Sequence, residues 1–229
     1  MGTVSKALSL LTNFNQSRTE IGLSEIARLA GVNKATAYRL LTELQEGGFV
    51  EQAGPDKTWR LGPEILRLAR LREAAVPMTT ASRAILERIA GETHETAHVS
   101  VLRGTELNAL AHVYSTRHAT RVMMEDAERL SLHGTGSGLA VLAFSPREFV
   151  ESVLAQPLAQ HTPDTITEPG AVRALLAPIA ETGIAESVGG FEADVHSHAA
   201  PVFGADGLPI GALAVAAPVA RVTPDRAAV

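Results

Sequence analysis

The chain has 229 residues, of which 45% are apolar and none is cysteine, and its formal net charge is −5 at pH 7. This length suffices for one large or two modest domains with a packed core, and the lack of cysteine excludes disulfides, Cys-based zinc fingers and a cysteine nucleophile. The start of the chain is polar throughout and no uncharged apolar run approaches the length of a membrane span, so we expect a cytoplasmic protein.

The first predicted helix covers residues 4–14. Its apolar residues recur at helical spacing, which assigns one set to the inward face: Val4, Ala7, Leu8, Leu11 and Phe14. A polar loop over residues 15–22 is expected to follow it.

Residues 23–49 read LSEIARLAGVNKATAYRLLTELQEGGF and predict two short helices across a tight turn. Ser24 is expected to cap the first helix with its hydroxyl, Gly31 to end it in a left-handed conformation, and Asn33 to cap the second helix. One apolar stripe at i, i+3, i+4 and i+7 predicts the buried face of the second helix: Ala37, Leu40, Leu41 and Leu44. The opposite face is polar and basic, so the pattern is that of a helix-turn-helix.

Two short strands are predicted next, at residues 49–52 and 58–61, with turn-forming residues at 53–57 between them. A helical hairpin of any function has an apolar and a charged face, but a following β-hairpin is typical of a winged helix-turn-helix. An arginine-rich helix at 64–76 then ends before Pro77.

The second half of the chain predicts helices mixed with apolar strands, which indicates an α+β fold with an antiparallel sheet. Helices are expected at residues 81–91, 139–144, 145–155 (capped by 145–148) and 168–182. Strands are expected at 96–102, 107–113, 121–124, 184–188, 197–203 and 208–217, and residues 223–225 resemble the start of one more helix.

Several segments, in order, resemble the IclR family of bacterial transcriptional regulators. They are LSEIARLAGVNKATAYRLLTELQEGGFVE and TWRLGP in the first half, and THETAHVSVLRG, LSLHGTGSGLAVLAF, TPDTITEP and AAPVFGADGLPIGALAVAAP in the second. The resemblance implies a winged helix-turn-helix DNA-binding domain (1–62), a linker helix (63–77) and a GAF-like α/β effector-binding domain (78–229). It also implies a homodimer or homotetramer that binds partly palindromic, double-stranded operator DNA and a small organic-acid effector.

Carried over position by position, the resemblance assigns eight residues to DNA binding: Ser24, Lys34, Ala35, Thr36, Tyr38, Arg39, Lys57 and Arg60. Arg39 suits a bidentate contact to guanine, whereas Ser24, Lys57 and Arg60 suit phosphates. Residues 1–62 hold seven Lys and Arg against six Asp and Glu, a net charge of +1 that leaves −6 for the remainder. We therefore expect weak DNA binding by one chain, strengthened by dimerisation.

The resemblance also assigns an effector pocket: Leu130, Gly134, Thr135, Gly136, Ser137, Ser187, Ser197, Ala214 and Ala216. A glycine-rich turn that opens a helix presents backbone N–H groups to a carboxylate, although the same glycines could simply form a tight turn. The family's usual lysine after this turn is Leu139 here, and the last strand has alanines where polar residues are common. We therefore expect an effector with a hydrophobic or aromatic part beside its carboxylate.

His196 and His198 share one face of a predicted strand. With His98, His112 or His133 they could bind a metal; they could equally hydrogen-bond a ligand carboxylate or remain solvated. The spacing of a histidine pair carries little information, so no metal ligand and no cofactor are predicted.

Two other classes of function compete with a ligand-responsive regulator. A hydrolase-like enzyme would need a nucleophile motif, but Ser137 lies in Gly-Thr-Gly-Ser-Gly followed by leucine, which is not the G-x-S-x-G elbow. A winged helix used only for protein interaction would not need Lys34 and Arg39. The sequence predicts no enzyme, and it leaves open repressor or activator, dimer or tetramer.

Overall fold

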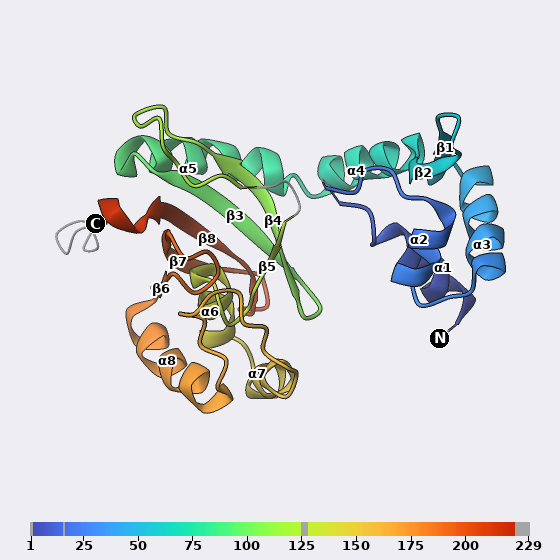
Figure 1. Ribbon diagram of the computed structural model, residues 1–229. Coiled ribbons are helices and arrows are strands. Elements are labelled where there is room, and N and C mark those ends of the chain that lie inside the picture. Colours follow the sequence, from blue (N-terminus) through green and yellow to red (C-terminus); the bar gives the residue numbers. More distant parts are fainter. Residues whose placement is uncertain (1, 16, 125–127, 223–229) are drawn as a thin grey trace. The chain divides into compact units, whose positions relative to one another are not determined.

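The computed structural model describes residues 2–15, 17–124 and 128–222 (Figure 1). The chain divides into two compact units, Met1–Pro77 and Met78–Val229. None of the helices in the described part of the chain is long and apolar enough to cross a membrane. The helix expected from residues 223–225 lies outside the described residues.

The N-terminal unit is a three-helix domain with a β-hairpin and a trailing helix. Its elements are α1 (Thr3–Leu11), α2 (Leu23–Leu29), α3 (Lys34–Glu46), β1 (Val50–Ala53), β2 (Thr58–Leu61) and α4 (Pro63–Ala75). Strands β1 and β2 pair antiparallel, and Trp59 of β2 is fully buried and bridges to Ile21 in the loop before α2. The winged helix-turn-helix that the sequence predicts is therefore the fold of this unit.

Two sequence predictions in this unit are wrong. Ser24 does not cap α2, because the helix begins at Leu23 and its N-cap is Gly22, which has no side chain to offer. Of the inward set predicted for the first helix, Ala7, Leu11 and Phe14 do pack against the core. Val4 and Leu8 do not: they are 72% and 55% exposed, and Leu10 is the fully buried residue. The apolar spacing of α1 fits two faces, and packing against α3 selects the one that contains Leu10.

The C-terminal unit is built on a six-stranded antiparallel sheet in the order β5-β4-β3-β8-β7-β6. Its strands are β3 (Thr96–Arg103), β4 (Glu106–Val113), β5 (Arg129–Leu130), β6 (Ala185–Val188), β7 (Val195–Phe203) and β8 (Pro209–Pro218). Its helices are α5 (Met78–Thr93), α6 (Gly136–Ala143), α7 (Arg147–Leu154) and α8 (Pro169–Thr182), with a 3-10 turn η1 (Val219–Arg221).

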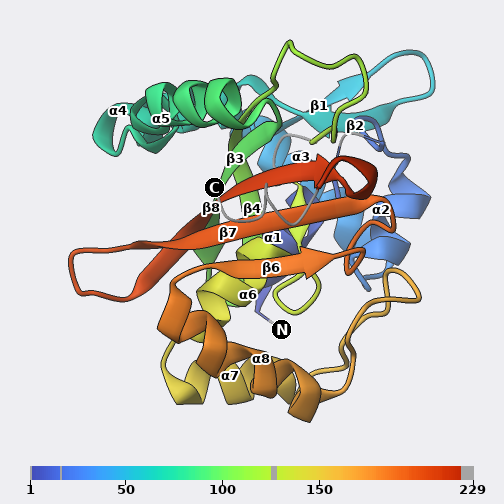
Figure 2. The ribbon, with the colours of Figure 1, turned by 90° about the vertical axis from the view of Figure 1, so that its left-hand side faces the viewer.

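The two faces of the sheet are covered differently. Helix α5 packs Leu86 and Ala90 against Ala97 and Val99 of β3 on one face. Helix α6 packs on β6, β7 and β8 on the other face, where the larger core lies, with α8 outside it. In Figure 2, β6, β7 and β8 cross the view with α5 above them and α7 and α8 below. Helix α5 packs mainly on β3, β4 and β8, and its C-terminal residues line a groove together with His196 and His198 of β7.

Two further predictions in the C-terminal unit are wrong. The described structure has no strand at residues 121–124; β5 at Arg129–Leu130 pairs with β4 instead. The hydroxyl of Tyr114 accepts a hydrogen bond from the N–H of Met124 and donates one to the Met124 carbonyl. These two bonds take the place of hydrogen bonds to a neighbouring strand. Helix α7 has Pro146 at its N-cap without a side-chain cap, and Ser145 donates backwards to the carbonyl of Val141.

Candidate nucleic-acid interface and ligand cavity

Local sequence sets the position of α3. Gly31 has φ +65° and turns the chain after α2, and the side chain of Asn33 accepts a hydrogen bond of 2.8 Å from the N–H of Thr36. Ala37, Leu40 and Leu41 are buried against the rest of the domain. Because these three residues occupy one side of the helix, the opposite side is held outward in a fixed orientation.

The predicted recognition residues lie on that outward side. Lys34, Ala35, Tyr38 and Arg39 are exposed, and Thr36 is half-buried at the first turn. Arg39 Nη1 lies 2.6 Å from Glu43 Oε1, one turn along the same exposed face. A contact between Arg39 and DNA would therefore have to replace this ion pair.

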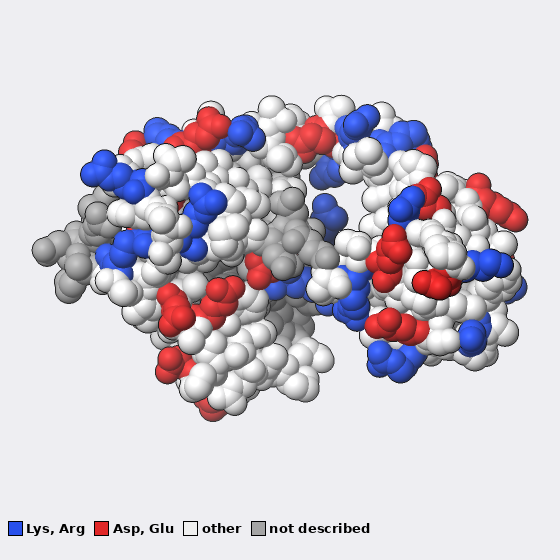
Figure 3. Space-filling model, turned by 45° about the horizontal axis from the view of Figure 1, so that its top comes forward, with Lys and Arg blue, Asp and Glu red and all other residues white. Residues whose placement is uncertain are grey.

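The hairpin supplies two more of the predicted residues. Lys57 is exposed at its turn with φ +52°, and Arg60 on β2 lies 2.7 Å from Glu51 and 3.8 Å from Glu20. Neither Lys34 nor Lys57 forms an ion pair with any described residue. On the face seen in Figure 3, basic and acidic side chains are interspersed over the N-terminal unit and do not gather into one basic surface.

A cavity of about 40 Å³ lies in the C-terminal unit where α6 begins. The residues around it come from β3, the segment before β5, the turn into α6, and β6 to β8. They are His98, Val122, Met124, Glu128, Leu130, Gly134, Thr135, Ser137, Ser187, Phe191, Glu192, Val195, Ser197 and Ala216.

Seven of the nine predicted pocket residues line this cavity: Leu130, Gly134, Thr135, Ser137, Ser187, Ser197 and Ala216. Gly136 does not line it; it packs directly against β7, where a Cβ would lie 2.9 Å from Ser197 Oγ. Ala214 does not either, since it is packed in the core beneath α6.

Hydrogen bonds fix the polar end of the cavity. Thr135 caps α6 by accepting from the N–H of Gly138 at 2.9 Å, and Ser197 Oγ accepts from the N–H of Gly136 at 3.2 Å. Ser187 Oγ donates to the carbonyl of Gly134 at 2.8 Å. The N-terminus of α6, which favours negative charge, is thereby held against β6 and β7 at the cavity wall.

His98 is a cavity residue that the pocket prediction missed. It is 4% exposed, its Nε2 lies 3.2 Å from Ser137 Oγ, and its Nδ1 has no hydrogen-bond partner among the described residues. Burial, and secondarily His112, lowers its pKa from 6.5 to about 4, so the ring is neutral near pH 7. Thr96, His98 and Ser100 alternate along β3, so the sequence could place them on one face of the strand. It could not show that this face is the one that α6 covers.

The charged residues at the cavity are acidic. Glu128 and Glu192 line it, and no Lys or Arg is among its lining residues in the described chain. Burial raises the pKa of Glu192. Attraction for an anion therefore comes from the α6 N-terminus and neutral donors, and not from a cation.

The histidine pair of β7 faces away from this cavity. Ser197 lines the cavity, so His196 and His198, its neighbours on either side, are on the opposite face of the strand. The two imidazoles are therefore not placed to hydrogen-bond a ligand that is held in this cavity. The potential metal ligand that lies beside this pair is Glu186 of β6, and not His98, His112 or His133.

Family models match both units. The model of the IclR helix-turn-helix domain matches residues 3–54, and the model of the bacterial transcriptional regulator IclR C-terminal domain matches residues 74–229. Among characterised relatives, the transcriptional repressor IclR of Escherichia coli is 27% identical over 98% of this chain and 82% of its own length. The glycerol operon regulatory protein of Streptomyces griseus is 30% identical over 98% and 88%.

Solved structures agree along the whole chain. A protein from Silicibacter sp. TM1040, described as an IclR transcriptional regulator, is 59% identical with a TM-score of 0.95, covering 99% of this chain and 89% of its own. An IclR homologue from Microbacterium hydrocarbonoxydans, crystallised in complex with 4-hydroxybenzoate, is 29% identical with a TM-score of 0.82 over 98% and 92%.

These matches run through the helix-turn-helix, the hairpin and the sheet domain in one order. They favour a DNA-binding regulator over the hydrolase and the interaction module considered from the sequence. The chain belongs to the IclR family of bacterial transcriptional regulators, a family of DNA-binding proteins and not of enzymes.

Proposed function

We propose that this regulator binds operator DNA as a homodimer or homotetramer, and that a small organic acid with a hydrophobic or aromatic part alters that binding. In this proposal residues 1–62 bind DNA, residues 63–77 form the linker helix, and residues 78–229 bind the effector. The observation that carries the effector assignment is the cavity at the α6 N-terminus, which is lined by His98, a buried residue whose Nδ1 has no partner among the described residues.

The lining of the cavity supports an amphipathic acid. Val122, Met124, Leu130, Phe191 and Val195 provide apolar surface. The hydroxyl of Ser137, in the first turn of α6, provides a donor for a carboxylate when it accepts from Nε2 of His98. A second polar group that donates a hydrogen bond, such as a phenol, would complement the Nδ1 of neutral His98. A hydroxyaromatic acid carries both groups, and a related protein was crystallised with 4-hydroxybenzoate.

The cavity must widen to take such a ligand, because about 40 Å³ holds roughly three water molecules. Met124 is a lining side chain suited to this, since its three rotatable bonds let it repack at low cost. The expected mode of binding is thus an exchange of internal side-chain contacts for ligand contacts.

Exposed apolar residues on two helices support self-association. Leu66 and Leu71 on α4 are each 56% exposed, and none of the α4 residues is buried. Val4 and Leu8 on α1 are exposed as well. Where such residues form a contiguous apolar patch, that patch marks an interaction surface. Sedimentation of the wild type against Leu66→Ser/Leu71→Ser tests this, and a wild type that stays monomeric at operator-binding concentrations would refute it.

DNA binding is tested with a fluorescent duplex from the promoter beside the gene, at stated salt, with Arg39→Ala as the matched variant. We expect specific binding by the wild type and a loss of roughly tenfold or more in the variant. Equal binding of operator and scrambled duplex by both proteins would contradict the assignment of α3.

Effector binding is tested by calorimetry with 4-hydroxybenzoate, benzoate, pyruvate and glyoxylate, followed by operator titration with and without each acid. We expect 4-hydroxybenzoate to bind and to shift operator affinity, and His98→Leu to weaken its binding about fivefold to tenfold by loss of one hydrogen bond. Tight binding of pyruvate or glyoxylate, with neither binding of the aromatic acids nor a change in operator affinity on their addition, would contradict the proposal.

A further inference from the structure

A cluster of metal-ligating side chains lies on the sheet face that is opposite to the effector cavity. Glu186 of β6 stands directly across from His198 of β7, and His196 is the next residue along β7 on the same face. Glu186 Oε1 lies 2.6 Å from His196 Nε2 and 3.6 Å from His198 Nε2. One ligand atom from each of the three residues lies within 4.8 Å of the other two.

The two imidazoles are held by the fold. Their rings stack with centroids 4.7 Å apart and an interplanar angle of 28°, and both direct Nε2 towards the same carboxylate. His196 is buried and His198 is half-buried, whereas Glu186 is exposed. The nitrogen donors are therefore positioned in advance, and the oxygen donor can adjust.

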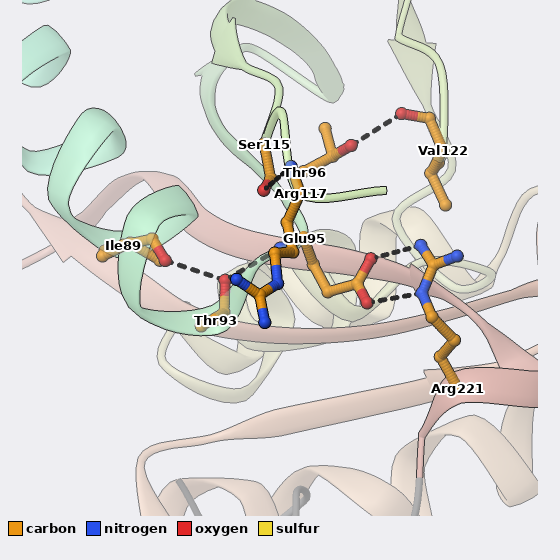
Figure 4. Close-up of polar contacts among 8 residues, drawn as sticks. All are labelled: Ile89, Thr93, Glu95, Thr96, Ser115, Arg117, Val122 and Arg221. Atoms are coloured by element: carbon orange, nitrogen blue, oxygen red, sulfur yellow. Dashed lines mark hydrogen bonds and ion pairs between the residues drawn. The ribbon is translucent and has the colours of Figure 1, made fainter. Parts of the chain in front are cut away.

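The two histidines of the cluster lie at a groove. His196 and His198 line a groove of about 530 Å³ beside the C-terminal end of α5. Glu95, on the same groove, is not a further ligand: it is 5% exposed, and both of its oxygens accept hydrogen bonds from Arg221 at 2.7 and 2.6 Å (Figure 4). Coordination positions beyond the three residues are thus left for water.

We propose that Glu186, His196 and His198 bind one transition-metal dication of the Zn²⁺ class through one carboxylate oxygen and two Nε2 atoms, with water completing a tetrahedron. Zn²⁺ accepts this combination of nitrogen and oxygen ligands. Ligand atoms 2.0 Å from a tetrahedral ion lie about 3.3 Å apart. The carboxylate must therefore retreat by less than about 1 Å from its hydrogen bond with His196, which exposed Glu186 can do.

This site is separate from the effector cavity, although the same two strands carry both. Ser187 and Ser197 pair across β6 and β7 and face the cavity, while Glu186, His196 and His198 alternate with them on the other side. Metal binding therefore requires no effector, and the two sites are tested independently.

The experiment uses the full chain stripped with a chelator, titrated with Zn²⁺ against a chromogenic zinc indicator. We expect one Zn²⁺ per chain and a higher melting temperature with Zn²⁺. His198→Ala should weaken binding by about a hundredfold or more, because even loss of an outer-shell partner costs about 10–100-fold. His161→Ala, an exposed histidine outside the cluster, is the matched control and should bind as the wild type does.

Glu186→Gln tests the site with a variant that is expected to fold, because this side chain is exposed and glutamine keeps a hydrogen-bonding oxygen. We expect this variant to melt at the wild-type temperature without metal and to gain little from Zn²⁺. Co²⁺ in place of Zn²⁺ should give the visible absorption of a tetrahedral site in the wild type only. Equal Zn²⁺ affinity in wild type, Glu186→Gln and His198→Ala would overturn the proposal, as would a wild type that binds no Zn²⁺.

Discussion

The Nε2 atom of His98 lies 3.2 Å from the hydroxyl oxygen of Ser137, so β3 and the first turn of α6 meet at the wall of the cavity in the C-terminal unit. The other ring nitrogen of His98 has no partner among the described residues. A buried polar atom without a partner destabilises the fold, and such atoms are concentrated where a ligand or water completes the bonding. His98 therefore bears on the stability of the fold and, in the proposed function, on ligand recognition as well.

Acid should destabilise the C-terminal unit through His98. Its pKa is about 4 when folded and near 6.5 when unfolded, so between these values the unfolded chain binds more protons. The stability due to neutral His98 is complete above about pH 6.5 and falls by on the order of 3 kcal/mol as pH drops to 4. Urea unfolding at pH 7.5, 6 and 5 measures this loss of stability. His98→Gln should flatten the pH dependence of the free energy of unfolding. An unchanged pH dependence in the variant would show that another group is responsible.

Removing the charge of Glu192 should strengthen binding of an acid. Glu192 lines the cavity, and a ligand carboxylate is repelled by it whenever it is ionised. We expect Glu192→Gln to bind 4-hydroxybenzoate roughly threefold to tenfold more tightly at pH 8. Because burial raises the pKa of Glu192, this gain should shrink as pH falls and the wild-type side chain takes up a proton. Calorimetry at pH 8 and 5.5 tests both points, and weaker binding by the variant would mean that Glu192 accepts a hydrogen bond from the ligand.

Glu43 should restrain Arg39 on the DNA-facing side of α3. Their ion pair is exposed, so it contributes only about 0.3–0.5 kcal/mol to stability, but it adds a negative charge near the phosphates. Glu43→Gln should tighten operator binding about twofold to fivefold. The salt dependence of binding should change little. The pair Arg83–Glu87 on α5 has the same i,i+4 spacing, so Glu87→Gln is the control and should leave operator binding unchanged. Weaker binding by Glu43→Gln in fluorescence anisotropy would contradict this.

Gly138 and Gly91 should respond in opposite ways to alanine. A Cβ on Gly138 would lie 2.3 Å from the carbonyl oxygen of Ser131, so Gly138→Ala should destabilise the unit by about 1–3 kcal/mol. Gly91 is exposed on α5 with no atom within 4 Å of such a Cβ, so Gly91→Ala should stabilise it by about 0.5–1 kcal/mol. Thermal unfolding compares the two, and destabilisation by both would indicate that α5 is packed differently.

Features that depend on neighbouring residues could be predicted from the sequence. Gly31 and Asn33 set the turn and the start of α3, and the apolar stripe from Ala37 to Leu44 set its buried side, because both depend on geometry within one or two helical turns. The order of helix, turn, helix and hairpin, together with the family resemblance, gave the fold and the class of function.

Features that depend on which distant surfaces meet required the tertiary structure. The spacing on α1 fits two faces, and only packing on α3 chose Leu10 over Val4 and Leu8. His98 joins Ser137 from 39 positions away, and Glu186 joins His196 across two strands, because sheet register and the covering helix decide these neighbours. Sequence by itself determined the helix-turn-helix and the family; tertiary structure alone decided the cavity wall and the histidine–glutamate cluster, since side chains far apart in the chain become neighbours only when the sheet pairs and packs.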